Sequence, residues 1–87
     1  TPETVQDTLP YIEKIEEALT HMGEAIHKNI RKVDVCTRYS AMQYLIILSQ
    51  PIESEIPNIM TRIFMQYYKL QNNQNFTPTY EYIIMKD

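Results

Sequence analysis

The feature that most constrains this chain is a long periodic pattern of apolar residues in its first third. Apolar side chains recur every three or four positions, at Leu9, Ile12, Ile15, Leu19, Met22, Ile26 and Ile30. This spacing places them along one face of an α-helix. Thr8 is a suitable N-cap, and Pro10 fits the first turn, where its missing N–H costs nothing. We therefore expect a helix over about residues 9–32.

The next segment is predicted to be a second helix, from Val35 to about Gln50. Asp34 is a good N-cap, and Pro51 ends the segment. No charged residue lies between positions 39 and 50, which is typical of a central, buried helix. A strand is the competing interpretation of residues 44–48. The length between Asp34 and Pro51 favours the helix, because strands are usually shorter.

A third helix is expected to begin at Ser54 and to fade near position 70, where a polar loop over residues 71–79 precedes a short terminal element. The end of the chain is ambiguous. Thr77 followed by Pro78 is typical of a helix start, whereas the alternation of Tyr80, Tyr82 and Ile84 favours a strand. We prefer a short helix, since a single strand has no evident partner.

Length and composition favour one all-α domain. The chain has 87 residues, of which 44% are apolar, and Gly23 is its only glycine. A small β-rich domain normally needs several glycines in its turns. Residues 1–87 are thus predicted to form a single bundle of three main helices plus a short C-terminal helix or extended segment. The start at Thr1 in place of methionine is consistent with a fragment of a longer protein.

No pattern of catalytic residues stands out, so the chain is expected to be non-enzymatic, with no catalytic residue, metal or cofactor. Glu24 and His27 have a spacing used in di-iron bundles, but that site requires a second copy of the motif. Cys36 is the only cysteine, which rules out an internal disulfide and favours a nuclear or cytoplasmic location. No apolar run is long enough for a membrane helix.

Positive charge gathers where the first predicted helix ends. The cluster consists of His27, Lys28, Arg31, Lys32 and Arg38. One interpretation is a docking site for an acidic peptide or for phosphate. The other is compensation of the helix dipole together with solubility. The net charge of -3 argues against a general nucleic-acid binder.

Tyrosine and methionine are unusually frequent, with seven and five copies. Tyr67 and Tyr68 cannot both point inward on one helix, and exposed tyrosines favour interfaces. The function we predict is a protein–protein interaction module, either an adaptor or a self-association domain, with a protein or peptide partner. The alternative is a nucleic-acid-associated helical domain of a viral or chromosomal protein that uses the basic cluster at residues 27–38.

The first two predicted helices also resemble a known family. Ile12–Lys32, the turn Lys32–Val35 and the segment Arg38–Leu48 are similar to the first two helices of the integrase-binding domain of lens-epithelium-derived growth factor, one of the helical transcription-elongation N-terminal domains. In that family an apolar residue and an aspartate in the turn bind short motifs of chromatin and transcription partners. The resemblance implies a partner-binding role for Val33 and Asp34.

Overall fold

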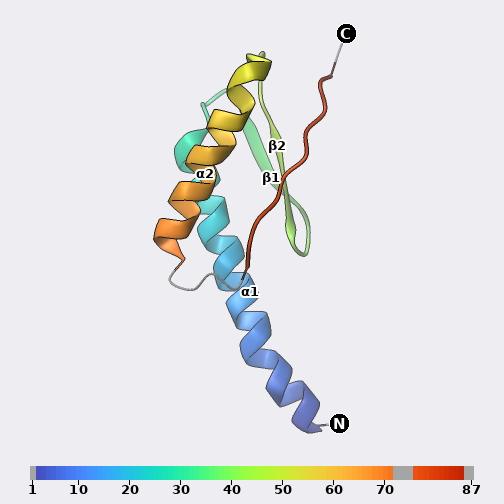
Figure 1. Ribbon diagram of the computed structural model, residues 1–87. Helices are drawn as coiled ribbons and strands as arrows, with labels where there is room; N and C mark the ends of the chain where they lie inside the picture. The colour runs from blue at the N-terminus through green and yellow to red at the C-terminus, as the bar shows by residue number, and fades with distance from the viewer. Residues whose placement is uncertain (1, 72–75, 86–87) are drawn as a thin grey trace.

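The computed structural model describes residues 2–71 and 76–85, with only the backbone described for residues 2–9. It is an α+β arrangement in which two helices pack together and a β-hairpin lies against them (Figure 1). Residues 76–85 are extended and run past the helices without belonging to a sheet. The elements are α1 (Pro2–Asn29), β1 (Val35–Ser40), β2 (Gln43–Ile47), the short 3₁₀ helix η1 (Glu53–Glu55) and α2 (Ile56–Leu70).

The first predicted helix is confirmed, with different ends. Helix α1 begins earlier than the apolar pattern indicated, so Pro10 lies inside the helix and not in its first turn. The helix ends at Asn29, whose side-chain amide donates a hydrogen bond of 2.8 Å to the carbonyl of Ala25. The Asn29 side chain thus adds a second donor to the carbonyl of the preceding turn, a local bond typical of asparagine near a helix end.

The second predicted helix is wrong, and with it the all-α fold class. Residues 35–47 form an antiparallel hairpin, in which Val35 pairs with Ile47 and Cys36 with Ile46. β-branched and aromatic residues are frequent in this segment, and such residues pack well on a pleated surface. The turn is held by the Arg38 guanidinium, which donates to the carbonyls of Ser40 and Ala41 at 3.0 and 2.8 Å.

The third predicted helix is confirmed as α2, and the terminal helix is wrong. Helix α2 begins two residues after Ser54, because residues 53–55 form the 3₁₀ turn, and Pro57 lies in its first turn as expected. The end of the chain is extended from position 76 to position 85. Of the predicted loop over residues 71–79, positions 72–75 lie outside the described residues.

The core lies between the two helices. Ala18, Ala25 and Ile26 of α1 meet Ile63 and Tyr67 of α2, and all five are buried. Small alanine side chains let the helices approach closely, so that the larger side chains of α2 fill the space between them. The hydroxyl of Tyr67 donates to the carbonyl at position 76 at 3.1 Å, which joins the core to the extended segment.

The hairpin is attached to α1 by Tyr44, whose ring lies over Gly23, the only glycine of the chain. The hydroxyl of Tyr44 donates a hydrogen bond of 2.7 Å to the carbonyl of Leu19. A Cβ atom at Gly23 would lie 2.8 Å from that same hydroxyl oxygen, closer than van der Waals contact allows. Gly23 is thus required because the Tyr44 ring crosses α1 at this point.

We expect Gly23→Ala to destabilise the protein by about 1 kcal/mol, because displacement of the Tyr44 hydroxyl outweighs the gain in helix propensity. In a Tyr44→Phe background the same change should be neutral or stabilising, since the clashing oxygen is absent. Urea denaturation of the four proteins in this double-mutant cycle measures the coupling. Equal effects of Gly23→Ala in both backgrounds would contradict this account.

Ile63→Ala should lower the free energy of unfolding by about 2–5 kcal/mol, because it leaves a cavity between α1 and α2. Ile63 is fully buried, whereas Ile52 is mostly exposed. Ile52→Ala removes the same atoms and should change stability by less than about 0.5 kcal/mol. Circular dichroism during urea titration compares the two variants. Similar losses would show that the core lies elsewhere.

Candidate functional site

The hairpin presents one face to the helices and the other to solvent. On the inner face Cys36, Tyr44 and Ile46 pack against the core. The outer face is apolar but exposed, which is unusual for a β-hairpin in water. Its exposed apolar residues are Val35, Tyr39, Leu45 and Ile47, of which Tyr39 and Leu45 also border the groove described below, and Thr37 is exposed among them.

Aromatic rings hold the extended segment 76–85 against the helices. Phe76 packs edge-on against Tyr11, with ring centroids 5.7 Å apart. Tyr80 packs in the same way on Phe64 of α2 at 5.9 Å. Further along, the hydroxyl of Tyr82 lies 3.4 Å from a carboxylate oxygen of Glu53. The segment therefore runs along α2 in the direction opposite to the helix.

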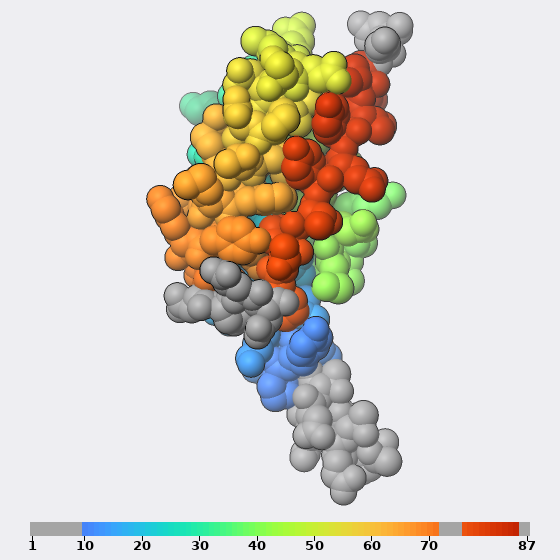
Figure 2. Space-filling view, in the orientation of Figure 1, coloured from blue at the N-terminus to red at the C-terminus, as the bar shows by residue number. Residues whose placement is uncertain are grey.

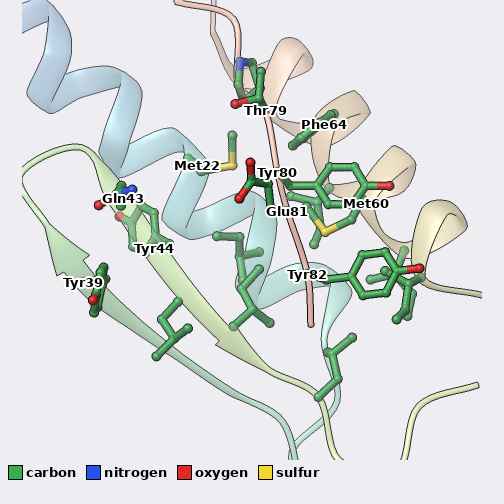
Figure 3. Close-up of a pocket in the computed structure, with 18 of the residues that line it drawn as sticks. Met22, Tyr39, Gln43, Tyr44, Met60, Phe64, Thr79, Tyr80, Glu81 and Tyr82 are labelled. Carbon is green, nitrogen blue, oxygen red and sulfur yellow. The ribbon is translucent and has the colours of Figure 1, made fainter. Parts of the chain in front are cut away.

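A groove of about 1010 Å³ opens between the hairpin and segment 76–85 (Figure 3). Its floor is the apolar face of α1, including Leu19, Met22 and Ile26. The strand β2 forms one side, and segment 76–85 together with α2 forms the other. Figure 2 shows segment 76–85, in red, between α2 and the green hairpin on the face in view.

The groove collects the tyrosines and methionines that made the sequence unusual. Its only charged lining residues among those described are the acidic Glu53 and Glu81. An apolar lining with acidic residues and no basic ones favours an apolar ligand that carries positive charge. The lining tyrosines and methionines are Tyr39, Tyr44, Tyr67, Tyr80, Tyr82, Met22, Met42, Met60 and Met85.

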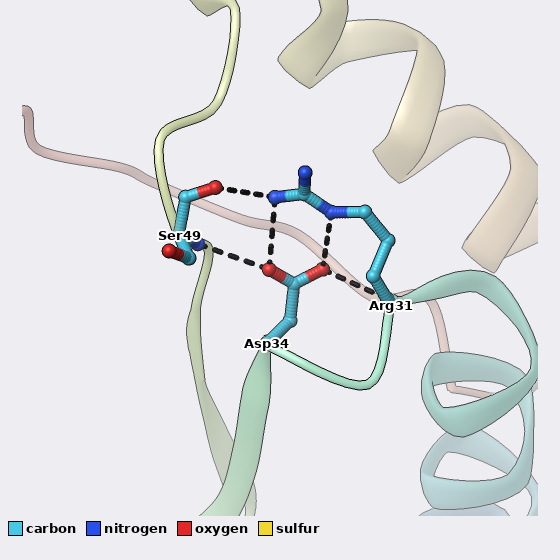
Figure 4. A network of polar contacts seen from close by, with 3 residues as sticks. All are labelled: Arg31, Asp34 and Ser49. Carbon is cyan, nitrogen blue, oxygen red and sulfur yellow. Dashed lines mark hydrogen bonds and ion pairs between the residues drawn. The ribbon is translucent and has the colours of Figure 1, made fainter.

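Asp34, predicted as a helix cap, instead joins the end of α1 to both ends of the hairpin (Figure 4). Its carboxylate accepts hydrogen bonds from the backbone N–H of Arg31 at 2.8 Å and of Ser49 at 2.9 Å. The Arg31 guanidinium donates to both carboxylate oxygens, at 3.2 and 3.1 Å. These bonds lower the pKa of Asp34 to about 2, and the hydrogen bond from the Arg31 side chain has the largest effect. The family resemblance implied that the Asp34 carboxylate binds a partner, but its oxygens accept hydrogen bonds from within the chain. Val33, the other residue that the resemblance named, is exposed.

The two arginines of the basic cluster make internal contacts. Arg31 binds Asp34 and the carbonyl of Ser49, which hold its guanidinium in place. Arg38 lies 5.6 Å from the centre of the Tyr44 ring and 3.8 Å from a carboxylate oxygen of Glu16. Lys28 and Lys32 are exposed. His27, Arg31 and Lys32 lie around one small pocket at the end of α1, whereas the guanidinium of Arg38 contacts the hairpin turn.

The paired tyrosines of α2 take different positions, as the helical spacing required. Tyr67 is buried in the core and its ring centroid lies 5.3 Å from that of Tyr68, which is half-buried. Burial raises the pKa of Tyr67, and electrostatic interaction with the neighbouring Tyr68 raises it further, to a smaller extent. Of the two, only Tyr67 lines the groove. Tyr80 and Tyr82, which the site prediction missed, line its side, and their alternation was the signal for an extended segment.

The reactive groups considered in the sequence, Glu24, His27 and Cys36, do not belong to a metal-binding cluster among the described side chains. Burial raises the pKa of the Cys36 thiol, which disfavours the thiolate that nucleophilic chemistry needs. No group of three or more metal-binding side chains occurs in residues 10–71 and 76–85, whose side chains the structure describes. Over the same residues, no helix has the length and hydropathy that crossing a bilayer requires.

Comparison with known proteins gives no relative: no family model, curated protein or solved structure matches this chain. The arrangement of its own residues is therefore the basis for a functional proposal.

Because the pKa of Asp34 is lowered by folding, the free energy of unfolding decreases at acidic pH. The ionised form of Asp34 is favoured in the folded state, so this contribution is present above the unfolded pKa of about 3.8 and is lost as pH falls toward about 2. We expect Asp34→Asn to remove on the order of 1–2 kcal/mol at neutral pH, because the neutral amide loses the bonds of the carboxylate. It should also flatten the fall in stability between pH 4 and pH 2.

Urea denaturation across this pH range tests the prediction. Glu13→Gln, which removes a carboxylate from an exposed position on α1, is the control and should keep the acid-dependent loss. An unchanged acid dependence in Asp34→Asn would show that the network of Figure 4 does not stabilise the fold.

Proposed function

We propose that this chain is a non-enzymatic protein-interaction module that binds a segment of another protein in the groove between β2 and residues 76–85. The observation that carries the proposal is the groove itself. It has a volume of about 1010 Å³ and an apolar lining, on a domain whose core is otherwise small. Exposed apolar surface of this extent has a cost in water that a binding partner removes.

The composition of the lining supports protein binding over chemistry. Methionine side chains are flexible and polarisable, so they adapt to varied apolar partners. Tyrosine rings bury a large area while their hydroxyls stay hydrated, which is why they are enriched at interfaces. The described lining contains no histidine or cysteine, the residues that most often supply a base or a nucleophile.

Charge favours a protein partner over a nucleic acid. The groove carries Glu53 and Glu81, which repel phosphate. Arg31 and Arg38 of the basic cluster are held by contacts within the chain. A nucleic-acid role would also make binding fall steeply with added salt, because phosphate contacts release counterions. Apolar docking in the groove depends on salt much less.

The test is selection of binders from a displayed library of random short peptides, followed by fluorescence anisotropy with the best one. Met42→Glu places a charge at the groove and should weaken binding by at least about tenfold, a loss of about 1.4 kcal/mol. Met65→Glu is the matched control, since Met42 and Met65 are 62% and 58% exposed but only Met42 lines the groove. Met65→Glu should bind like the parent.

Three outcomes would contradict the proposal. They are no enriched peptide, equal weakening by both variants, and affinity that falls steeply between low and physiological salt. Light scattering separates the two forms of the module. Growth of the particle mass with concentration, abolished by Met42→Glu, identifies self-association, whereas a constant mass identifies an adaptor for a different protein.

A further inference from the structure

The groove differs in charge between its two ends. One end lies at the hairpin turn, where Met42 and Phe76 are among the lining residues. The other end lies at η1, where the carboxylate of Glu53 meets the hydroxyl of Tyr82 and Glu81 is the neighbouring residue. Among the described residues that line the groove, only these two glutamates are charged. Negative charge is therefore confined to the η1 end, and the turn end is uncharged.

Segment 76–85 contributes side chains to the groove. Within residues 2–71 and 76–85, no backbone–backbone hydrogen bond involves this segment. Tyr80 and Tyr82 point toward α2, whereas Glu81 points away from α2 and toward the hairpin (Figure 3). The Glu81 carboxylate is therefore presented on the side from which a ligand of the groove is in reach.

Neither groove carboxylate has a cation beside it among the described side chains. The ion pairs of residues 10–71 and 76–85 lie elsewhere, at Asp34 and at Glu16. The contact of Glu53 with Tyr82 is a hydrogen bond of 3.4 Å from a neutral hydroxyl. The charge of Glu53 raises the pKa of Tyr82, so this hydroxyl keeps its proton at neutral pH. The negative charge at the η1 end is thus available to a ligand.

We infer that the groove binds its partner segment in one direction, with apolar residues toward the hairpin turn and a lysine or arginine at the η1 end, beside Glu53 and Glu81. This inference rests on the proposed function and adds the charge and the orientation of the ligand. The apolar residues supply affinity by burial against methionine and aromatic side chains. The basic residue supplies direction, because a reversed segment would place its charge among uncharged side chains and leave both carboxylates unpaired.

The charge of the whole chain favours a basic partner over a second copy. The net charge is -3, so two copies repel each other, whereas a basic segment is attracted. Both groove glutamates are exposed, and exposed ion pairs add little affinity. Their role is therefore selection and orientation of the ligand. Raising salt from low to physiological concentration should weaken binding only about twofold, because screening acts on this exposed contact alone.

The test uses the best peptide that the displayed library selects, labelled with fluorescein and titrated with the full chain. The selected sequences should share a lysine or arginine on one side of their apolar residues. Replacement of that residue by glutamine should weaken binding about fivefold. The double variant Glu53→Gln/Glu81→Gln should weaken the original peptide by the same factor. It should not weaken the glutamine peptide further, because both changes remove one interaction.

The double variant Glu24→Gln/Glu55→Gln is the matched control. It removes the same net charge from two exposed glutamates, neither of which lines the groove. Binding of the original peptide should change by less than about twofold, since these charges act on the ligand only through solvent. Equal weakening by the two double variants would show that net charge alone acts, and would overturn the assigned position of the basic residue.

A nitroxide label on the basic end of the peptide tests the direction of binding. In nuclear magnetic resonance spectra the nitroxide broadens the signals of nearby methionine methyl groups. Met85 lines the groove beyond Tyr82, toward the η1 end, and Met42 lines it at the turn. We expect strong broadening of the Met85 methyl signal and little broadening of that of Met42. The opposite pattern, or equal broadening, would overturn the fixed direction.

These outcomes are distinct from those that test the proposed function. If the selected peptides discriminate Met42→Glu from Met65→Glu but contain no basic residue, the groove remains the binding site and its charge preference is overturned. If no peptide is selected, the groove and the orientation of its ligand are overturned together.

Discussion

The buried carboxylate of Asp34 fixes the geometry on which the rest of the molecule depends. It binds the backbone N–H of Arg31, where the chain leaves α1, and that of Ser49, where the chain leaves β2. One side chain thereby sets the angle at which the hairpin leaves the helix and closes its open end. Without it, the two backbone amides would lack the acceptor that their partly buried position requires.

This junction determines which face of the hairpin meets the helices. With the strand ends held together, Tyr44 and Ile46 point inward, and the Tyr44 hydroxyl reaches the carbonyl of Leu19 across Gly23. The hairpin then stands as one side of the groove above the floor made by α1 and α2. The groove is thus a product of tertiary placement, and no segment of the chain contains it alone.

The two long helices could be predicted because their apolar residues repeat with helical spacing over many positions. The hairpin was missed because residues 39–50 form an uncharged run in which neither period stands out. Its turn at Ala41 and Met42 contains none of the glycine or asparagine that usually marks a two-residue hairpin loop. The β-branched residues of the segment were the available signal, but the length criterion outweighed them.

The candidate site was harder to predict for a related reason. An aspartate at the start of a segment accepts N–H bonds equally well in a helix cap or in a turn, so Asp34 gave no distinction between the two. The excess of tyrosine and methionine indicated side chains beyond the needs of a small core. Which of them gather depends on the path of residues 76–85, which ring contacts at Tyr11 and Phe64 determine.

The way in which segment 76–85 is attached also determines where the molecule opens first. Ring contacts and hydroxyl hydrogen bonds hold it, whereas β1 and β2 are joined by a backbone ladder with one irregularity between Arg38 and Ser40. Segments without backbone bonds separate from a fold at a small fraction of the global unfolding free energy. This side of the groove can therefore swing away from α2 while the core stays intact.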